Sequence, residues 1–494
     1  MGHSYFISGG DLTLVRKDAL KLRLNAAPGT GLMYLRRTIQ RARSSNQSVA
    51  SPDTVSKAST DASPWKFAIR ALRYRNYRLF FGGQSVSLIG TWMTRIATSW
   101  LVYRLTHSAF LLGVAGFSLQ IPILLIGPFA GVWVDRLDRH RVLVITQILS
   151  MIQSFWLAAL ALTGRITVTD IIWLSLFQGA INAFDMPARQ AFVVQMVEDR
   201  ADLSNAIALN SSMVNGARLI GPSVAGIIIA TVGEGYCFLI DGFSYIAVIA
   251  SLLLMHITRE QVRANRTDVL RELKEGWQYV SHFAPIRSIL LLLGLVSLVG
   301  MPYTVLMPIF AGSVLHGGAH TLGFLMGAAG VGALIGALAL ATRRSVVGLG
   351  RVVTLTSAGF GLGLVAFSNS RWLSLSLVLM MVTGFCMMTQ MASSNTILQT
   401  IVDDDKRGRV MSFYSMAFQG TAPFGSLIAG AAASRIGAPK TLMIGGSLCV
   451  VGAAWFYTQL PKIRAIVRPI YRQLGIIPEV AVGIEAAATV ERKE

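Results

Sequence analysis

The chain has 494 residues, of which 53% are apolar and only 14% are charged. Soluble domains are about 45–50% apolar and about 25% charged, so this composition excludes a soluble globular protein. The formal net charge of +20 would suit a partner of nucleic acid. Lys and Arg lie mainly in alternate segments between apolar runs, however, which is the positive-inside pattern of membrane proteins. The pattern predicts a multi-pass protein with both termini in the cytoplasm and no nucleic-acid partner.

The first segment differs in composition from everything after it. Residues 1–64 are rich in Ser, Ala, Arg and Gly and lack apolar periodicity, which predicts a disordered cytoplasmic extension without a signal peptide. Basic and aromatic residues alternate from Trp65 to Arg78, which predicts an interfacial lead-in to the first helix. A second cytoplasmic tail is expected at 461–494.

Apolar runs long enough to cross a bilayer recur along the rest of the chain, and a spanning helix needs about 20 residues. The sequence therefore predicts an all-α membrane protein. Six helices are expected in a bundle over 65–256 and six in a bundle over 288–460, with a cytoplasmic central loop at 257–287. The twelve spans are expected at 79–103, 110–134, 142–163, 170–192, 205–231, 236–256, 288–314, 320–341, 352–369, 372–394, 410–433 and 440–460.

An internal repeat supports two related halves. When the chain is shifted by 204 residues, six identities fall in one register without a gap. Such a parallel repeat predicts two pseudo-symmetric six-helix bundles. The matching pairs are Gln195 with Gln399, Asp199 with Asp403, Ser211 with Ser415, Gly216 with Gly420, Gly221 with Gly425, and Gly226 with Gly430.

The loop between the second and third spans carries an acid and several arginines beside hydrocarbon, where charges are costly and usually functional. It resembles the signature Gly-x-x-x-Asp-Arg-x-x-Arg-Arg of the major facilitator superfamily. An ordinary positive-inside loop would explain the arginines but neither Gly131 nor Asp135. The resemblance implies that the matching residues gate transport. They are Gly131, Asp135, Arg136, Arg139 and, after His140, Arg141.

Polar residues also recur on single faces of the first, fourth and fifth spans. Such faces must meet protein or water, because lipid cannot satisfy them. They predict either the wall of a substrate or proton pathway, or contacts between neighbouring helices. Arg95 and Arg218 favour function, because an arginine in hydrocarbon is costly. The candidate residues are Arg95, Gln178, Asn182, Asp185, Arg189, Asn215 and Arg218.

Several segments resemble one branch of the superfamily, which contains the enterobactin exporter and the transmembrane secretion effectors. The similarity covers about Trp65 to Pro461 and implies the major facilitator fold and export of a small molecule. The segments are Asp185-Met-Pro187-Ala-Arg189-Gln190, Asn215-Gly-Ala-Arg218-Leu-Ile-Gly221-Pro222, Asn395-Thr-Ile-Leu-Gln399 and Arg407-Gly408-Arg409.

Two positions depart from the branch pattern. Gly221-Pro222 resembles the helix-breaking motif of superfamily antiporters, but Ala225-Gly226 stands where a Gly pair is common. Many relatives carry Gly-Asp-Trp in the first span, whereas this chain has Gly90-Thr91-Trp92. An acid that could carry a proton is therefore missing there.

The tenth span is rich in methionine. Flexible Met side chains suit a pocket for varied apolar shapes, although plain core packing is the favoured explanation. Gln390 lies among these residues and is a candidate on the substrate pathway. The methionines are Met380, Met381, Met387, Met388 and Met391.

No nucleotide-binding loop, nucleophile motif or metal-ligand spacing is present, and the three cysteines are expected to be small apolar side chains. We therefore expect no enzyme activity, no cofactor and no metal. The leading hypothesis is a monomeric secondary transporter of the cell (inner) membrane, which exports a siderophore, drug or related metabolite in exchange for protons by alternating access. A lipid flippase of the same fold, or a membrane partner or sensor that moves nothing, remain alternatives.

Of the two intramembrane acids, Asp185 is the favoured proton carrier and Asp241 is the other candidate. Asp185 shares a face with Gln178 and Asn182 and precedes Arg189 by one turn, so burial and a cation oppose each other there. A permanent Asp185–Arg189 pair that only pins the fourth span is the alternative. Asp241 is expected near the outer surface, where water reaches it easily.

Overall fold

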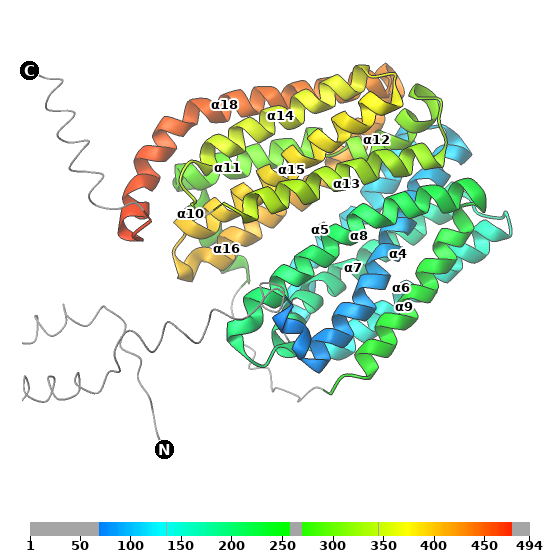
Figure 1. The fold of residues 1–494 in the computed structure, drawn as a ribbon, viewed down its shortest axis with the longest axis horizontal. Helices are drawn as coiled ribbons and strands as arrows, with labels where there is room; N and C mark the ends of the chain where they lie inside the picture. The colour runs from blue at the N-terminus through cyan, green and yellow to red at the C-terminus, as the bar shows by residue number, and fades with distance from the viewer. Residues whose placement is uncertain (1–68, 135, 257–268, 344, 477–494) are drawn as a thin grey trace, which may run out of the picture. The chain divides into compact units, whose positions relative to one another are not determined.

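The computed structural model describes residues 69–134, 136–256, 269–343 and 345–476. The extension expected at 1–64 and the gating candidate Asp135 lie outside the described residues. The elements below all belong to one compact unit, Ile69–Glu494. All the secondary-structure elements within the described ranges are helices (Figure 1).

The first half contains six long helices that match the first six predicted spans. A short helix, η1 (Arg70–Arg73), precedes them, and another, η2 (Arg200–Asp202), separates the fourth from the fifth. The six are α4 (Arg75–Thr106), α5 (Ala109–Val134), α6 (Arg139–Leu162), α7 (Val168–Met196), α8 (Leu203–Thr231) and α9 (Glu234–Leu253).

The second half repeats this arrangement, but its first and fifth spans are interrupted by turns of π-helix. The Ser297 hydroxyl donates a hydrogen bond to the Phe418 carbonyl, which joins two of these turns. The elements are α11 (Ala284–Leu295), η3 (Val296–Gly300), α12 (Tyr303–Ile309), η4 (Phe310–Val314), α13 (Ala319–Ala341), α14 (Leu349–Asn369), α15 (Leu373–Ile401), α16 (Asp404–Ser415), η5 (Met416–Gly420), α17 (Ala422–Ile436) and α18 (Ala438–Gln473).

Two connecting segments contain more helix than the sequence predicts. Part of the expected central loop is a helix, α10 (Val269–His282), which lies against α16 through an ion pair between Arg409 and Glu275 at 3.0 Å. The tail expected from residue 461 begins as a continuation of α18, which runs on to Gln473. Its periodic apolar residues keep packing against the protein beyond the predicted end of the span.

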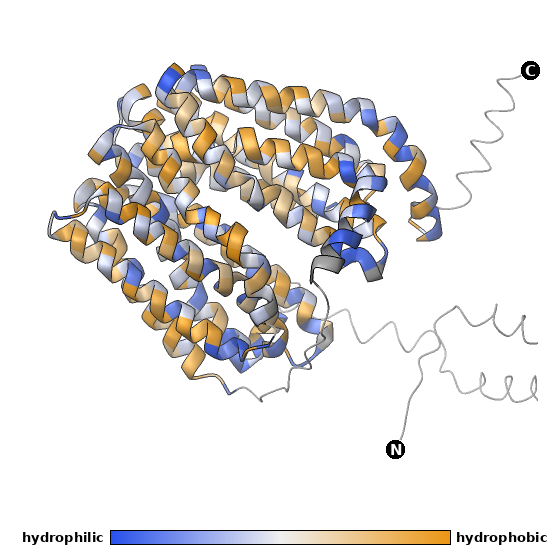
Figure 2. Cartoon of the chain, turned by 180° about the vertical axis from the view of Figure 1, so that it is seen from behind, coloured by the Kyte–Doolittle hydropathy of each residue, from blue (hydrophilic) through white to orange (hydrophobic). Residues whose placement is uncertain are grey.

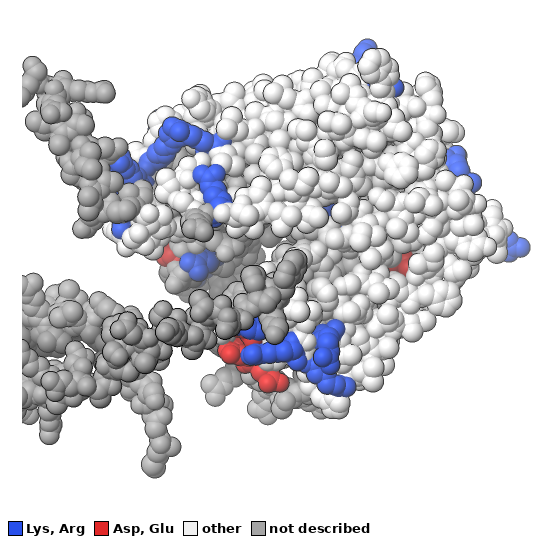
Figure 3. All heavy atoms as spheres, viewed as in Figure 1, with Lys and Arg blue, Asp and Glu red and all other residues white. Residues whose placement is uncertain are grey.

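Charge and hydropathy divide the helices into a middle and two ends. Apolar residues run along the helices and polar ones gather at their ends (Figure 2). Lys and Arg side chains cluster where α4 begins and α18 ends, which we call the basic end (Figure 3). In the described ranges, nine segments have the length and hydropathy of membrane spans. The other three, α4, α7 and α16–η5–α17, carry more polar residues.

Four glycines let the two halves touch at the end opposite the basic end. A methyl group on Gly226 of α8 would lie 2.9 Å from the Cα of Gly323 in α13. A methyl group on Gly430 of α17 would lie 2.8 Å from the Cα of Gly113 in α5. Because Gly226 and Gly430 are partners in the sequence repeat, the two halves use equivalent positions to approach each other. We call these two contacts the glycine seal.

A polar contact accompanies the glycine seal. The hydroxyls of Tyr103 in α4 and Ser313 in η4 lie 2.7 Å apart within hydrogen-bond distance. Gly312 leaves room for the Tyr103 ring, since a methyl group there would lie 2.5 Å from it. The halves are therefore held closely together at the end where α4 finishes.

Candidate functional site

Two arginines of the first half share one aromatic platform. The guanidinium carbon of Arg95 lies 4.9 Å from the ring centroid of Trp92, and that of Arg218 lies 5.6 Å from it. Arg95 follows Trp92 by three residues on α4, whereas Arg218 reaches the same indole from α8. A cation over an indole face is stabilised by the ring quadrupole. We call these three residues the arginine site.

Gly221 brings the two helices of the arginine site together. A methyl group on Gly221 would lie 2.5 Å from the Cβ of Trp92 and 3.0 Å from the Ile89 carbonyl. The helix break predicted at Gly221 and Pro222 is wrong, because α8 continues through both residues. Proline removes one intrahelical hydrogen bond, but neighbouring turns and helices hold the rest of α8 in place.

The second half completes the surroundings of the arginine site. Arg218 donates to the sulfur of Met387 in α15 at 3.8 Å, so its guanidinium faces the other half and not the lipid. Among the residues that the structure describes, no carboxylate forms an ion pair with Arg95 or Arg218. A nearby span also buries the Gln390 amide, which has no hydrogen-bond partner among the described residues. The arrangement can accept an anionic group.

The polar face of α7 lies against α6. Asp185 is 4% exposed, forms an ion pair with Arg189 at 2.8 Å, and accepts hydrogen bonds from Thr146 at 3.0 Å and Gln147 at 2.7 Å. These contacts fit the alternative of a permanent pair that pins the fourth span.

The next two candidates along the same face also make helix contacts. The Gln178 amide donates to the Asn182 side chain at 3.1 Å and to the Ser150 hydroxyl of α6 at 3.2 Å. Among the described residues, the Asn215 amide on α8 donates a hydrogen bond to the Ser211 carbonyl of its own helix and to no other helix. The polar stripe of α7 thus contacts α6, whereas Arg218 faces the other half.

The expectation that water reaches Asp241 easily is wrong. Asp241 is 1% exposed and is enclosed by α4, α6 and α9. Its Oδ2 accepts hydrogen bonds from Thr94 and Ser154, each at 2.8 Å, and its Oδ1 is buried without a hydrogen-bond partner. Gly90 leaves room for the carboxylate, since a methyl group there would lie 2.6 Å from Oδ1. No basic side chain is among these contacts.

The gating loop is partly described. Gly131 lies in the last turns of α5 with open space around its Cα, and Arg136 is exposed. Asp138 caps α6 by accepting hydrogen bonds from the backbone of its first turn, and it pairs with Arg141 at 3.5 Å. Arg139 is the first residue of α6. Asp138 is not among the residues singled out in the sequence, although an acid directly before the start of a helix is a typical capping residue.

A second charged cluster joins η1 to η2 at the basic end. The carboxylate of Asp202 is 1% exposed, accepts a hydrogen bond from the Tyr74 hydroxyl at 2.8 Å and forms ion pairs with Arg70 and with Arg73. Burial raises the pKa of Asp202, but the Tyr74 hydrogen bond and the two arginines outweigh it and lower that pKa. The segment expected as an interfacial lead-in is therefore tied to the fifth span.

Sequence reasoning missed Trp92 and misjudged Asp241. In the sequence, Trp92 stands out only as part of the altered motif Gly90-Thr91-Trp92. Arg95 follows it by three residues on the same helix face, however, and that spacing is a signal for a cation–π pair. Asp241 lies near the end of a predicted span, and this position led to the wrong expectation that water reaches its carboxylate. The surrounding helices, which no single sequence places, enclose it.

Comparison with known proteins identifies the family of the chain and several relatives. The family model for the transmembrane secretion effectors matches residues 66–477, so the chain belongs to that family. The staphyloferrin A transporter of Staphylococcus aureus is 27% identical over 78% of this chain and 97% of its own length. The multidrug efflux pump Tap of Mycolicibacterium fortuitum is 26% identical over 76% and 93%.

Solved structures share the fold. A crystal structure of the nucleoside transporter NupG aligns with a TM-score of 0.63 at 16% identity, over 78% of this chain and 99% of that one. An inward-facing bacterial homologue of the human lysosomal transporter Spinster aligns with a TM-score of 0.62 at 12% identity, over 80% and 97%. The chain is a multi-pass secondary transporter of the major facilitator fold, and the predicted fold class is confirmed.

Proposed function

We propose that the protein exports a small molecule with at least one anionic group from the cytoplasm in exchange for protons. The arginine site carries this proposal. Two guanidinium groups share one indole beside the second half, and no described carboxylate neutralises them. A substrate carboxylate or phosphate would supply the missing charge through two-pronged hydrogen bonds, which arginine favours. The name of one relative, the multidrug efflux pump Tap, supports the direction of transport.

The orientation follows from charge. The basic end would face the cytoplasm, in accord with the positive-inside rule, and both termini would lie there. The glycine seal would then lie at the outer side. Close contact at the outer side is expected of an inward-facing state, which an exporter uses to load its substrate.

Asp241 is our candidate for the proton site. A buried carboxylate without a cation is costly in a bilayer, so this group is suited to take up a proton. Asp241 lies seven residues into α9, about 10 Å along the helix from the proposed outer side. Its titratable neighbours on α9 are Tyr245 and Cys237, and its described partners on α4 and α6 are hydroxyls. Asp185, with Arg189 beside it, holds α6 and α7 together.

Substitutions at Arg218 test the substrate proposal. We expect Arg218→Lys to raise KM for an anionic fluorescent substrate roughly tenfold or more, because the second hydrogen bond is lost. Arg218→Ala should abolish its export. Uptake into inverted vesicles at matched expression measures both, with Arg165→Gln, an exposed arginine outside the arginine site, as the control. Equal loss of cationic and anionic substrates, or no loss of either, would argue against an anion site.

Substitution of each acid tests the coupling. Asp241→Asn in proteoliposomes should exchange substrate down its gradient but lose acceleration by an imposed pH gradient. Asp185→Asn should instead lower thermal stability and keep the pH response of the surviving protein. If Asp241→Asn still concentrates substrate when only a proton gradient is supplied, the proton site lies elsewhere.

A further inference from the structure

A groove separate from the arginine site opens at the basic end. Its volume is about 770 Å³, within the range of about 300–1,000 Å³ typical of small-molecule sites. It lies between the last turns of α18, the start of α14, and the neighbouring ends of α11 and α15. None of its lining residues belongs to the first half.

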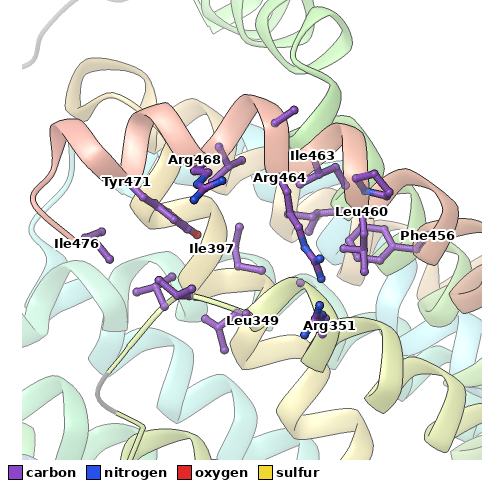
Figure 4. Close-up of a pocket in the computed structure, with 18 residues that line it drawn as sticks. Leu349, Arg351, Ile397, Phe456, Leu460, Ile463, Arg464, Arg468, Tyr471 and Ile476 are labelled. Atoms are coloured by element: carbon purple, nitrogen blue, oxygen red, sulfur yellow. The ribbon is translucent and has the colours of Figure 1, made fainter. Parts of the chain in front are cut away.

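The inner wall of the groove is one apolar face of α18. The residues on this face are spaced by three or four positions, as expected for a single helix face, and all are less than 9% exposed. Figure 4 labels Phe456, Leu460, Ile463 and Tyr471 of this face around the opening. The whole face consists of Phe456, Leu460, Ile463, Val467 and Tyr471.

The facing wall is held in shape by hydrogen bonds. Arg343 donates to the Val347 carbonyl at 2.8 Å and to the Ser345 carbonyl at 3.1 Å, which folds the segment before α14. Gly348 then adopts a left-handed backbone with φ of 85°, a conformation that glycine takes without strain, and α14 begins. The groove is therefore preformed.

Positive charge gathers at the opening. Arg351 of α14 and Arg464 of α18 point toward one another across the groove, and Arg468 lies one turn further along α18 (Figure 4). No described carboxylate forms an ion pair with Arg351 or Arg464. Two facing guanidinium groups repel each other, and an anion between them would turn that repulsion into attraction.

We propose that this groove binds one anionic phospholipid of the cytoplasmic leaflet, with its phosphate between Arg351 and Arg464 and an acyl chain along the apolar face of α18. The proposal rests on the orientation proposed above, which puts the basic end at that leaflet. Basic pockets at the cytoplasmic ends of membrane helices suit such headgroups. An amphipathic, basic helix segment such as the end of α18 suits the same interface.

A binding measurement on the full-length protein tests the proposal without any transport. The purified protein in detergent is titrated with dioleoyl phosphatidylglycerol and bound lipid is counted by native mass spectrometry. We expect one tight site, and roughly 30-fold weaker binding in the double variant Arg351→Gln/Arg464→Gln, at about tenfold per 1.4 kcal/mol and about 1 kcal/mol for each arginine. The control Arg371→Gln/Arg435→Gln removes two exposed arginines at the opposite end and should bind as the parent does.

Three further titrations, with phosphatidylcholine, inorganic phosphate and an exported substrate, distinguish which kind of ligand occupies the groove. Dioleoyl phosphatidylcholine should bind much more weakly, because its headgroup has no net charge. Inorganic phosphate should not displace phosphatidylglycerol at equal concentration, because it lacks the acyl chains. Equal binding of both lipids, displacement by phosphate alone, displacement by an exported substrate, or no effect of the double variant would each overturn the proposal. A failure of transport in any variant would leave this result unchanged.

Discussion

Gly226→Val tests whether the glycine seal controls which side of the transporter is open. The added Cβ would lie 2.9 Å from both the Ala319 carbonyl oxygen and the Gly323 Cα. An ordinary contact at that position is 3.4–4 Å, so the helices must move apart. Overpacking of this kind costs about 1–3 kcal/mol.

We expect the overpacking by Gly226→Val to destabilise only the state in which the glycine seal is closed. If α8 and α13 separate at Gly226 when the seal opens, the valine no longer presses on Ala319 and Gly323, so we expect no penalty in the outward-open state. We therefore expect the equilibrium to shift toward that state by about 5–150-fold. The equivalent change Gly430→Val, at the contact with Gly113, should have the same effect. Gly216→Val is the matched control on α8, because no atom lies within 4 Å of its added methyl group.

A cysteine reporter measures the shift. Ala109 is 7% exposed at the contact between α5 and α17, and the three native cysteines are buried. In Gly226→Val, Ala109→Cys should react with a membrane-impermeant maleimide in proportion to the outward-open population, and export should fall. If labelling and export match those of Gly216→Val, the seal does not set the equilibrium and the reasoning fails.

Two further outcomes are expected at the basic end. The lowered pKa of Asp202 means that its ionised form stabilises the fold above the ordinary pKa of 3.8 and that this contribution is lost as pH falls further. The difference in melting temperature between the parent and Asp202→Asn should therefore be large at pH 7 and shrink below about pH 4, and a constant difference would contradict the pairing with Arg70. Asp135→Asn, in the gating signature, should insert normally but export slowly at equal expression, and normal turnover would remove this residue from the mechanism.

Nine of the spans in the described ranges could be predicted because their length and hydropathy suit a bilayer, whereas α4, α7 and α16–η5–α17 carry more polar residues. The repeat that pairs Gly226 with Gly430 also predicted a structural equivalence, since both glycines occupy the seal. The amphipathic end of α18 was missed because its apolar residues are too sparse for a span, although their spacing of three and four is visible in the sequence.

The roles of the polar residues were harder to predict. Periodicity tells which residues share a face of one helix, but not which neighbour that face meets. The stripe that contains Asp185 proved to meet α6, whereas Arg218 meets Met387 of the other half. Burial of Asp241 depends on three helices together, so a position near a helix end gave the wrong expectation.

Adjacent residues on α4 connect the two proposed sites. Thr94 bonds to Asp241, while Arg95, about 100° further around the helix, lies over Trp92. Thr94 donates to the carboxylate, so we expect a proton on Asp241 to weaken this hydrogen bond and to loosen the contact between α4 and α9. If a proton changes the affinity for substrate in this way, substrate must change the affinity for the proton by the same factor.

Thr94→Val tests this link, because it keeps the β-branched shape but removes the hydroxyl. We expect the substrate Kd of the parent, measured in detergent by isothermal titration, to change with pH, and that of Thr94→Val to change much less. Thr98→Val, one turn further along α4 and outside the contacts of Asp241, is the control. A full pH dependence in Thr94→Val would mean that the proton and the substrate communicate by another route.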